Sequence, residues 1–546
     1  MTATREEFSG TARDSLVAGV GTAVSRLTGV ARVVMVGGVL GPTTFGDTFQ
    51  LTNSLPNLVY YGFLAGSLFA SLLVPALVRH VDAGDPDRTA RVSGGFLGFS
   101  WLAMLVLVPV VVLVIPTAIG LLAPGGEAAV ATQTDQARLL LLLMCPQVFL
   151  YALSGASASV LNAHRRFALA ALAPAVENVG MIAMLAATWL VYGSVAEQGG
   201  QPTGVLVLLG LGSTTAVAAN AALAWAGARS SGVTVRPRAG WRDPEVMSVV
   251  RRAVRAVVQA GLLALQMLVL LLLAGRAAGG TVALQMVFNF YSLPIELVAT
   301  PVGLALIPRL SRMHRARQAR DFRETYLEGL DLALFLAVPA AIGYVLLAGP
   351  VAHSIAVGAM ASAAGVGMMA GALATIAPGI VGQTAFYISM QAAYARQDTR
   401  TPLVSMSIQT AVCLSLALAT LAVPGEQAVR LLGAAYAAGA LVGGLHLTRA
   451  MIRRSELPAR RLAPLALRLS VGALAMALPV LVVAEVLVAN VGGRAGWLLS
   501  LVLGTLVGAV VFLGVQLVMR SPELAALRHG VRGKASRQVL TEEVVQ

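Results

Sequence analysis

Residues 15–79 read SLVAGVGTAVSRLTGVARVVMVGGVLGPTTFGDTFQLTNSLPNLVYYGFLAGSLFASLLVPALVR. Two long apolar segments meet at a short turn, Gly41-Pro42, and are interrupted by Arg26, Arg32 and Asp47. A charge inside a membrane-spanning helix is costly, so it persists where it faces a polar cavity or a partner. The alternative is that both arginines extend to the membrane surface, but Arg32 lies far from either end of its segment. The stretch therefore predicts a pair of membrane helices with a charged face turned away from lipid.

The composition indicates the class of protein. Of 546 residues, 57% are hydrophobic and 12% are charged, which excludes a soluble globular chain and predicts an all-α polytopic membrane protein. The net charge of +14 comes from arginines in the loops between apolar segments. We therefore expect anionic membrane lipids as partners and no nucleic acid. Cys145 and Cys413 both lie in apolar segments, so no disulfide framework is expected.

About fourteen segments are long and apolar enough to cross a bilayer, which takes about 20 residues. They lie near residues 15–40, 47–78, 92–121, 137–162, 168–192, 203–227, 246–275, 282–308, 328–348, 364–395, 402–423, 429–450, 466–489 and 495–519. The second and tenth contain Pro56 and Pro378, and proline is expected to bend a spanning helix.

The loops differ strongly in charge from one side of the membrane to the other. The loop after the eighth segment alone carries Arg309, Arg312, Arg315, Arg317, Arg320 and Arg323, whereas the loops of the opposite side carry Arg138, Arg276, Arg430 and Arg494. Arginine-rich loops stay in the cytoplasm, so this asymmetry predicts a cytoplasmic location for both termini.

Short patterns recur in the two halves of the chain at a nearly constant offset. Residues 73–79 (LVPALVR) resemble residues 306–312 (LIPRLSR), and residues 162–168 (NAHRRFA) resemble residues 394–400 (YARQDTR). Both pairs fall on one predicted side of the membrane, which indicates two six-helix lobes in a parallel pseudo-two-fold repeat plus two C-terminal helices. The predicted parts are an N-terminal segment 1–14, a first lobe 15–227, a linker 228–245, a second lobe 246–450, a loop 451–465, two further helices 466–519 and a basic tail 520–546.

Several motifs together resemble one family. They are SRLTGVAR (25–32), FGDTF (45–49), LPN (55–57), VPALVR (74–79), LNAHRRFALAALAP (161–174), LIPRLSR (306–312) and YARQDTRTP (394–402). In this order they resemble the MurJ/MviN family, whose members flip lipid-linked peptidoglycan precursors and belong to the multidrug/oligosaccharidyl-lipid/polysaccharide exporter superfamily. The resemblance implies a bacterial cytoplasmic-membrane transporter that works by alternating access.

The resemblance also implies a site. The family's first-helix arginines, which meet the anionic precursor, match Arg26 and Arg32, and its acidic residue in the second helix matches Asp47. Arginine suits a diphosphate because it offers permanently charged, planar donors. The candidate substrate-binding residues are Arg26, Arg32, Asp47, Asn57, Tyr60 and Asn289.

This chain departs from the family pattern at four positions. Tyr60 and Tyr61 stand where the family has two arginines, Ala65 stands in place of a glutamate, and Asn289 in place of an arginine. The substrate is thus left open between lipid II and another polyprenyl-linked glycan.

Two additional carboxylates, Glu177 and Glu296, lie within apolar segments. Each is a candidate for ion coupling in a shared polar space, or else a protonated or arginine-paired structural group.

The chain is not expected to be an enzyme. It has no phosphate-binding loop with lysine before serine or threonine, and no HExxH motif, so neither ATP nor a metal cofactor is indicated. Transport would use an ion gradient, the membrane potential or the substrate gradient. The alternatives are a cation-coupled multidrug exporter, which Arg26 and Arg32 argue against, and a non-transporting scaffold that binds envelope-synthesis proteins.

Overall fold

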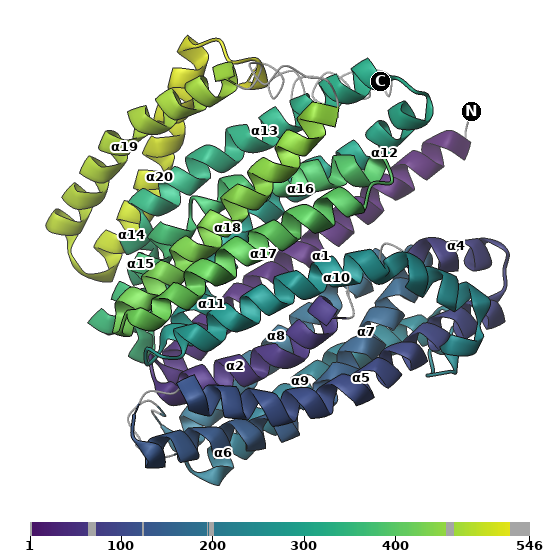
Figure 1. The fold of residues 1–546 in the computed structure, drawn as a ribbon, viewed down its shortest axis with the longest axis horizontal. Coiled ribbons are helices and arrows are strands. Elements are labelled where there is room, and N and C mark those ends of the chain that lie inside the picture. The colour runs from purple at the N-terminus through teal and green to yellow at the C-terminus, as the bar shows by residue number, and fades with distance from the viewer. Residues whose placement is uncertain are drawn as a thin grey trace, which may run out of the picture. The chain divides into compact units, whose positions relative to one another are not determined.

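The computed structural model describes residues 3–63, 73–122, 125–193, 195, 201–454 and 463–524. Every regular element within these residues is a helix (Figure 1). The chain forms two compact units. Unit 1 comprises Met1–Asn289, Ala356–Gly365 and Ala419–Val429, and unit 2 comprises Phe290–Ile355, Val366–Leu418 and Arg430–Gln546.

Unit 1 holds the helices that follow the N-terminus. They are α1 (Ala3–Leu40), α2 (Thr44–Leu58), η1 (Val59–Phe63), α4 (Val74–Asp82), α5 (Pro86–Leu122), α6 (Glu127–Met144), α7 (Pro146–Ala163), α8 (Phe167–Tyr192), α9 (Thr203–Ser230), η4 (Gly240–Arg242), α10 (Pro244–Ala274), most of α11 (Gly280–Pro294), η6 (Gly358–Ala361) and η7 (Thr420–Ala422). By packing, α10 and α11 belong to this unit, whereas the repeat places the lobe boundary at the linker 228–245. The lobe boundaries therefore stay a prediction.

Unit 2 holds the remaining helices. They are η5 (Ile295–Ala299), α12 (Thr300–Arg315), α13 (Ala319–Leu346), α14 (Ala348–Ile355), most of α15 (Ala363–Ile376), α16 (Gly379–Ala395), α17 (Arg400–Ala419), most of α18 (Gly425–Arg454), α19 (Ala463–Val491) and α20 (Gly493–Val518). Most of the predicted loop 451–465 and of the basic tail 520–546 lies outside the described residues.

The predicted fold class is confirmed, and the count of fourteen spans is approximate. Among the described residues twelve helices are long and apolar enough to cross a bilayer, and the bent pair α15–α16 makes a thirteenth. All of them coincide with predicted spans. Of the second predicted span the structure describes α2, which contains Pro56, the π-helix η1 and the start of α4, while residues 64–72 lie outside the described residues. Pro378 lies at the 47° bend between α15 and α16, as expected for a proline within a span.

The backbone carries the predicted repeat. Helices α4 and α12 are each followed by a left-handed residue, Gly84 (φ 67°) and Arg317 (φ 56°), at the offset of the sequence patterns. Helices α7 and α16 are likewise followed by Arg165 (φ 58°) and Gln397 (φ 61°). In each of the four turns, the residue after the left-handed one donates its backbone N–H to the carbonyl five residues before it. This is the hydrogen bond that defines a Schellman motif. The two recurring sequence patterns therefore fold alike.

A π-helix occurs at corresponding places in the two halves. η1 starts three residues after Pro56, and η5 starts directly after Pro294. A π-helical turn is rare and is found most often at functional positions, since it breaks the regular hydrogen bonding of the helix. The two π-helices start 236 residues apart, close to the offset of the sequence patterns, and each follows a proline.

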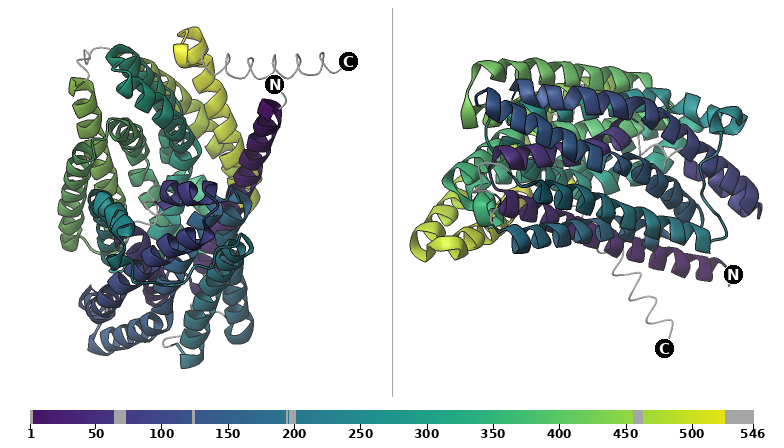
Figure 2. Two further views of the ribbon diagram at one scale, coloured as in Figure 1. Left: turned by 90° about the vertical axis from the view of Figure 1, so that its right-hand side faces the viewer. Right: turned by 90° about the horizontal axis from the view of Figure 1, so that it is seen from below.

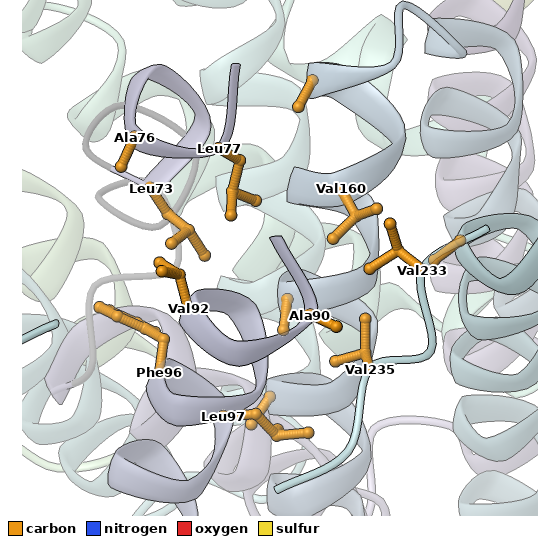
Figure 3. Packing of buried hydrophobic residues seen from close by; sticks show 14 of the residues in the cluster. Leu73, Ala76, Leu77, Ala90, Val92, Phe96, Leu97, Val160, Val233 and Val235 are labelled. Carbon is orange, nitrogen blue, oxygen red and sulfur yellow. The ribbon is translucent and has the colours of Figure 1, made fainter. Parts of the chain in front are cut away.

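The linker is part of the core of unit 1. Figure 3 shows the buried cluster, in which α4, α5 and α7 meet the linker; the labelled members are Leu73, Ala76, Leu77, Ala90, Val92, Phe96, Leu97, Val160, Val233 and Val235. The N–H of Arg238 donates to the carbonyl of Gly94 at 2.9 Å. A side chain at Gly94 or Gly98 would collide with the linker backbone, so glycine permits this close approach.

A short network of hydroxyl hydrogen bonds lies within the apolar core of unit 2. The Tyr326 hydroxyl and the Ser389 hydroxyl are 2.8 Å apart, and the Ser389 hydroxyl is 3.0 Å from that of Thr448, which joins α13, α16 and α18. Helices α19 and α20 form a hairpin that stays together in Figure 1 and in the right-hand view of Figure 2. The rings of Phe335 (α13) and Phe512 (α20) are 5.4 Å apart, so this hairpin packs on α13.

An ionic cluster fixes the start of α10. Arg88 donates to Asp243 at 3.0 Å and to Glu245 at 2.8 Å, and His80 lies 3.0 Å from Glu245. Asp243 is the N-cap of α10 and accepts from the N–H of Glu245 at 2.9 Å. Arg79 also reaches Glu245, at 3.2 Å, but its side chain is 69% exposed against 28% for Arg88.

The cluster lowers the pKa of the Glu245 carboxyl. Burial alone would raise this pKa, but the hydrogen bonds from His80 and Arg88 outweigh it. A carboxyl with a lowered pKa stabilises the fold at pH values above its unfolded-state pKa, and this contribution is lost as the pH falls through the folded-state pKa.

We predict that Arg88→Ala lowers the free energy of unfolding by about 1–3 kcal/mol at neutral pH, because it removes charge-assisted hydrogen bonds from a half-buried cluster. Arg79→Ala is the matched control and should change it by less than about 0.5 kcal/mol, since that ion pair is exposed. Thermal unfolding of the purified protein measures both variants. The loss in Arg88→Ala should shrink as the pH is lowered below the pKa of Glu245. Equal losses in the two variants would contradict the prediction.

Candidate functional site

A polar cavity of about 140 Å³ lies inside unit 1. It is lined from α1, α2 and α7–α11, so most spans of the unit contribute to it. Its polar lining residues are Arg32, Gln50, Asn53, Ser54, Asn57, Tyr151, Glu177 and Gln285. Its apolar lining residues are Val33, Val36, Leu58, Met181, Val217 and Met267.

Close packing of α1 on α8 positions the charged pair of this cavity. Asn178 of α8 donates to the carbonyl of Ser25 at 3.1 Å and to the hydroxyl of Thr28 at 3.2 Å. Gly21 of α1 permits close approach to α8, since a β-carbon there would lie 3.0 Å from that of Ala171. Small residues allow two spanning helices to approach in this way. Glu177 precedes Asn178 on α8, and its side chain lines the cavity beside Arg32 of α1.

Arg32 and Glu177 form an ion pair within the spans. Nη1 of Arg32 lies 3.6 Å from Oε1 of Glu177, and the two side chains are 27% and 8% exposed. Tyr151 donates its hydroxyl proton to Oε1 at 2.8 Å, and Asn220 donates to Oε2 at 2.8 Å. The charge of the arginine is thus balanced inside the protein, and the carboxylate is held by two neutral donors.

A row of polar residues on α2 also lines the cavity. Gln50, Asn53, Ser54 and Asn57 line the cavity at helical spacings of three and four residues. The amide of Gln50 donates to the hydroxyl of Ser54 at 2.9 Å. Of these four only Asn57 was predicted. Their spacing on one face of an otherwise apolar span was the signal that could have found the others.

The structure brings together three of the sequence-predicted residues, namely Arg32, Asn57 and Glu177. Arg26 is exposed on α1 and does not line the cavity. The two arginines are six residues apart and so point about 120° apart on a regular helix. Tyr60 is buried and stacks on Tyr151, with ring centroids 6.2 Å apart, so it supports a lining residue from behind. Substrate contact by Arg26 and Tyr60 stays a prediction.

Two further predicted residues lie outside the cavity lining. Asn289 is half-buried on α11 and donates to the carbonyl of Gln285, a lining residue, at 2.7 Å. Glu296 lies in η5, within unit 2. That Glu177 and Glu296 share one polar space stays a prediction, and Ala65 lies outside the described residues.

Asp47 acts as a cap on another helix. It is 2% exposed and accepts from the N–H of Gly279 at 2.7 Å and from the N–H of Val282 at 3.0 Å, at the start of α11. A carboxylate is favoured there because the first N–H groups of a helix lack partners and carry partial positive charge. Gly279 has a left-handed φ of 83° and packs against Pro42. The structure gives Asp47 a role in joining the first turn of α2 to the turn before α11.

We predict that Asp47→Ala destabilises the protein by about 1–3 kcal/mol, because it leaves two buried N–H groups without an acceptor. Asp47→Asn should lose less, since the amide oxygen can still accept one of the bonds. Asp135→Asn, at a side chain that is 77% exposed, is the control and should be neutral. The measurement is the thermal midpoint of the purified protein, and an unchanged midpoint in Asp47→Ala would refute the capping role.

The repeated membrane fold and the charged cavity within its spans define a polytopic transporter. A family model described as "Lipid II flippase MurJ" matches residues 36–520, and the chain belongs to this family.

Curated relatives agree with this assignment. A probable lipid II flippase MurJ of Rhizobium meliloti (strain 1021) is 27% identical over 405 residues, which cover 73% of each chain. A probable lipid II flippase MurJ of Rhizobium tropici is 24% identical over 442 residues, 81% of each chain.

Solved structures share the fold. The structure titled "Lipid II flippase MurJ, inward closed conformation" matches with a TM-score of 0.67 and 18% identity, over 92% of this chain and 98% of that one. An inward-facing multidrug resistance MATE family transporter of the MOP superfamily matches with a TM-score of 0.62 and 14% identity, over 79% of this chain and 94% of that one.

Proposed function

We propose that this chain flips a polyprenyl-diphosphate-linked cell-wall glycan precursor, lipid II or a related lipid-linked glycan, from the cytoplasmic to the outer leaflet by alternating access. Its family and the names of its curated relatives support this substrate class. The chain is a multi-pass membrane protein, and transport rather than catalysis is the activity of its family.

The observation that carries the proposal is that the Arg32 guanidinium has donors available to a ligand. Its guanidinium faces a cavity inside the membrane-spanning helices, and among the described residues it has an ion-pair partner but no hydrogen-bond acceptor. A guanidinium in this state offers its planar donors to a phosphate. The amides of Gln50, Asn53 and Asn57 nearby can bind phosphate or sugar oxygens.

An apolar cavity in unit 2 supports a lipid substrate. It has a volume of about 460 Å³ and is lined by residues of α11, α13, α14, α19 and α20, among them Leu293, Leu347, Val480 and Leu501. Hydrocarbon binds in such a cavity without loss of hydrogen bonds.

The multidrug-exporter alternative is less well supported. The MATE neighbour shares the fold at 14% identity, which carries no information on substrate. A cavity for cationic drugs should be acidic, whereas Arg32 neutralises Glu177 in this one. A pure scaffold, the other alternative, would have no need of a charged cavity inside its spans.

The proposal extends to energy, orientation and partners. An ion gradient or the membrane potential would drive the cycle, with Glu177 and Glu296 as candidate coupling groups. Both termini would be cytoplasmic, and the arginine-rich loops would face anionic lipid. Proteins of envelope synthesis are further candidate partners.

We predict that Arg32→Ala abolishes transport, because it removes the permanent charge that binds the diphosphate and leaves Glu177 buried without its cation. Truncating one member of such a pair costs on the order of 2–5 kcal/mol. Arg32→Lys should restore only part of the activity, since it keeps the charge and loses the planar fork. Arg26→Ala should reduce activity less, because Arg26 lies outside the cavity lining.

The measurement is complementation of a bacterial strain depleted of its own precursor flippase. If the precursor differs from that of the host, flipping in proteoliposomes with a defined polyprenyl-diphosphate glycan replaces it. Full activity of an Arg26→Ala, Arg32→Ala double variant at normal membrane abundance would overturn the anion-binding mechanism.

We predict from the arginine asymmetry that reporters fused after Leu121 and after Gly349 lie outside the cytoplasm. Leu121 lies at the end of the third span and Gly349 follows the ninth. A cytoplasmic signal at either site, from a fusion of normal abundance, would reverse the orientation or change the number of spans before it.

A further inference from the structure

The contacts of Glu177 differ in kind from those of Arg32. Both carboxylate oxygens accept short hydrogen bonds from neutral donors, at 2.8 Å from Tyr151 and at 2.8 Å from Asn220. The arginine is 3.6 Å away, which is close enough for strong attraction but beyond the usual length, about 2.7–2.9 Å, of a charge-assisted hydrogen bond. The carboxylate is therefore fixed in place independently of the arginine.

Its two donors are themselves fixed. Tyr151 stacks on the buried ring of Tyr60. Asn220 accepts from the hydroxyl of Ser154 at 3.2 Å through its amide oxygen, which turns its amide NH₂ toward Glu177. Three helices, α7, α8 and α9, thus hold one carboxylate at a set distance from an arginine of a fourth helix, α1.

We propose that Glu177 is a built-in counter-anion of Arg32 and sets how tightly the site holds a diphosphate. This inference rests on the proposed function. In the empty site the carboxylate compensates the arginine without using its N–H donors, and a phosphate group of the substrate takes those donors when it binds.

The physical consequence is a balance between attraction and repulsion. Arg32 attracts the diphosphate, and Glu177, a few ångströms away, repels it through a poorly screened interior. A site with Arg32 alone would bind the anion more tightly but would release it slowly. A transporter must release its substrate on the far side, so a weakened site favours turnover.

Neutralising the carboxylate should therefore change binding and transport in opposite directions. Glu177→Gln keeps the side-chain shape, and the Tyr151 hydroxyl can accept from the new amide. We expect the variant to bind a polyprenyl diphosphate roughly tenfold or more tightly, with a lower maximal rate of flipping. Loss of structure alone would weaken binding, so this pattern separates the two roles.

Tyr151→Phe supplies the opposite test. It removes one neutral donor and keeps the charge, so the carboxylate can move onto Arg32 and compete with the phosphate. We expect weaker binding in Tyr151→Phe, and no such weakening when Tyr151→Phe is added to Glu177→Gln. Glu485→Gln, at an exposed position of α19, is the control for removing one carboxylate and should match the wild type.

The experiment uses the full-length protein in nanodiscs, with binding of a polyprenyl diphosphate measured directly and flipping of a lipid-linked glycan measured in proteoliposomes. If the wild type binds no polyprenyl diphosphate, the proposed function fails. If the wild type binds it but Glu177→Gln binds equally or less tightly, only the role of Glu177 fails. Should Glu177→Gln not accumulate, Tyr151→Phe decides alone, and unchanged or tighter binding in that variant would overturn the inference. Weakening by Tyr151→Phe in the Glu177→Gln background would also overturn it, because the tyrosine would then contact the substrate itself.

Discussion

The structure of unit 1 depends on a permanent positive charge within a membrane-spanning helix. Arginine does not lose its proton in proteins, so the charge of Arg32 must be compensated where it lies. Glu177 supplies the compensation, and α1 and α8 pack closely at small residues such as Gly21. The polar groups around the pair then follow from the cost of burying a carboxylate, which needs donors of its own.

Breaks in regular helix structure accompany this polar interior. The second span contains Pro56 and the π-helix η1, and the corresponding part of the other half contains Pro294 and η5. Such turns leave carbonyl and N–H groups less regularly bonded, which a lipid-facing helix does not tolerate but a protein-lined cavity does. Asp47 is part of the same pattern, since it accepts from two buried N–H groups at the start of α11 that have no partner within that helix.

Much of the fold could be predicted because its determinants are local. Apolar length identifies a span, and proline marks the spans that bend or divide, as Pro378 does. The repeat could be predicted because similar short sequences end helices in both halves of the chain. The turns at these sequences share their backbone geometry, with Arg165 and Gln397 in equivalent left-handed positions. The site was predicted only in part. Arg32, Asn57 and Glu177 meet in one cavity, whereas Asp47 caps a helix and Asn220 was not foreseen.

The sequence by itself determined the class of protein, the spans, the repeat and the presence of a charge that needs a partner, because hydropathy, proline and arginine act over a few residues. Only the tertiary structure decided which groups meet. Arg32 and Glu177 come from the first and fifth spans, and Asp47 and Gly279 are also far apart along the chain, so their pairing depends on the packing of whole helices. The local sequence around a carboxylate in an apolar segment does not show whether the group caps a helix or balances a cation. The difference between those roles lies in distances of a few ångströms, which no single stretch of the sequence contains.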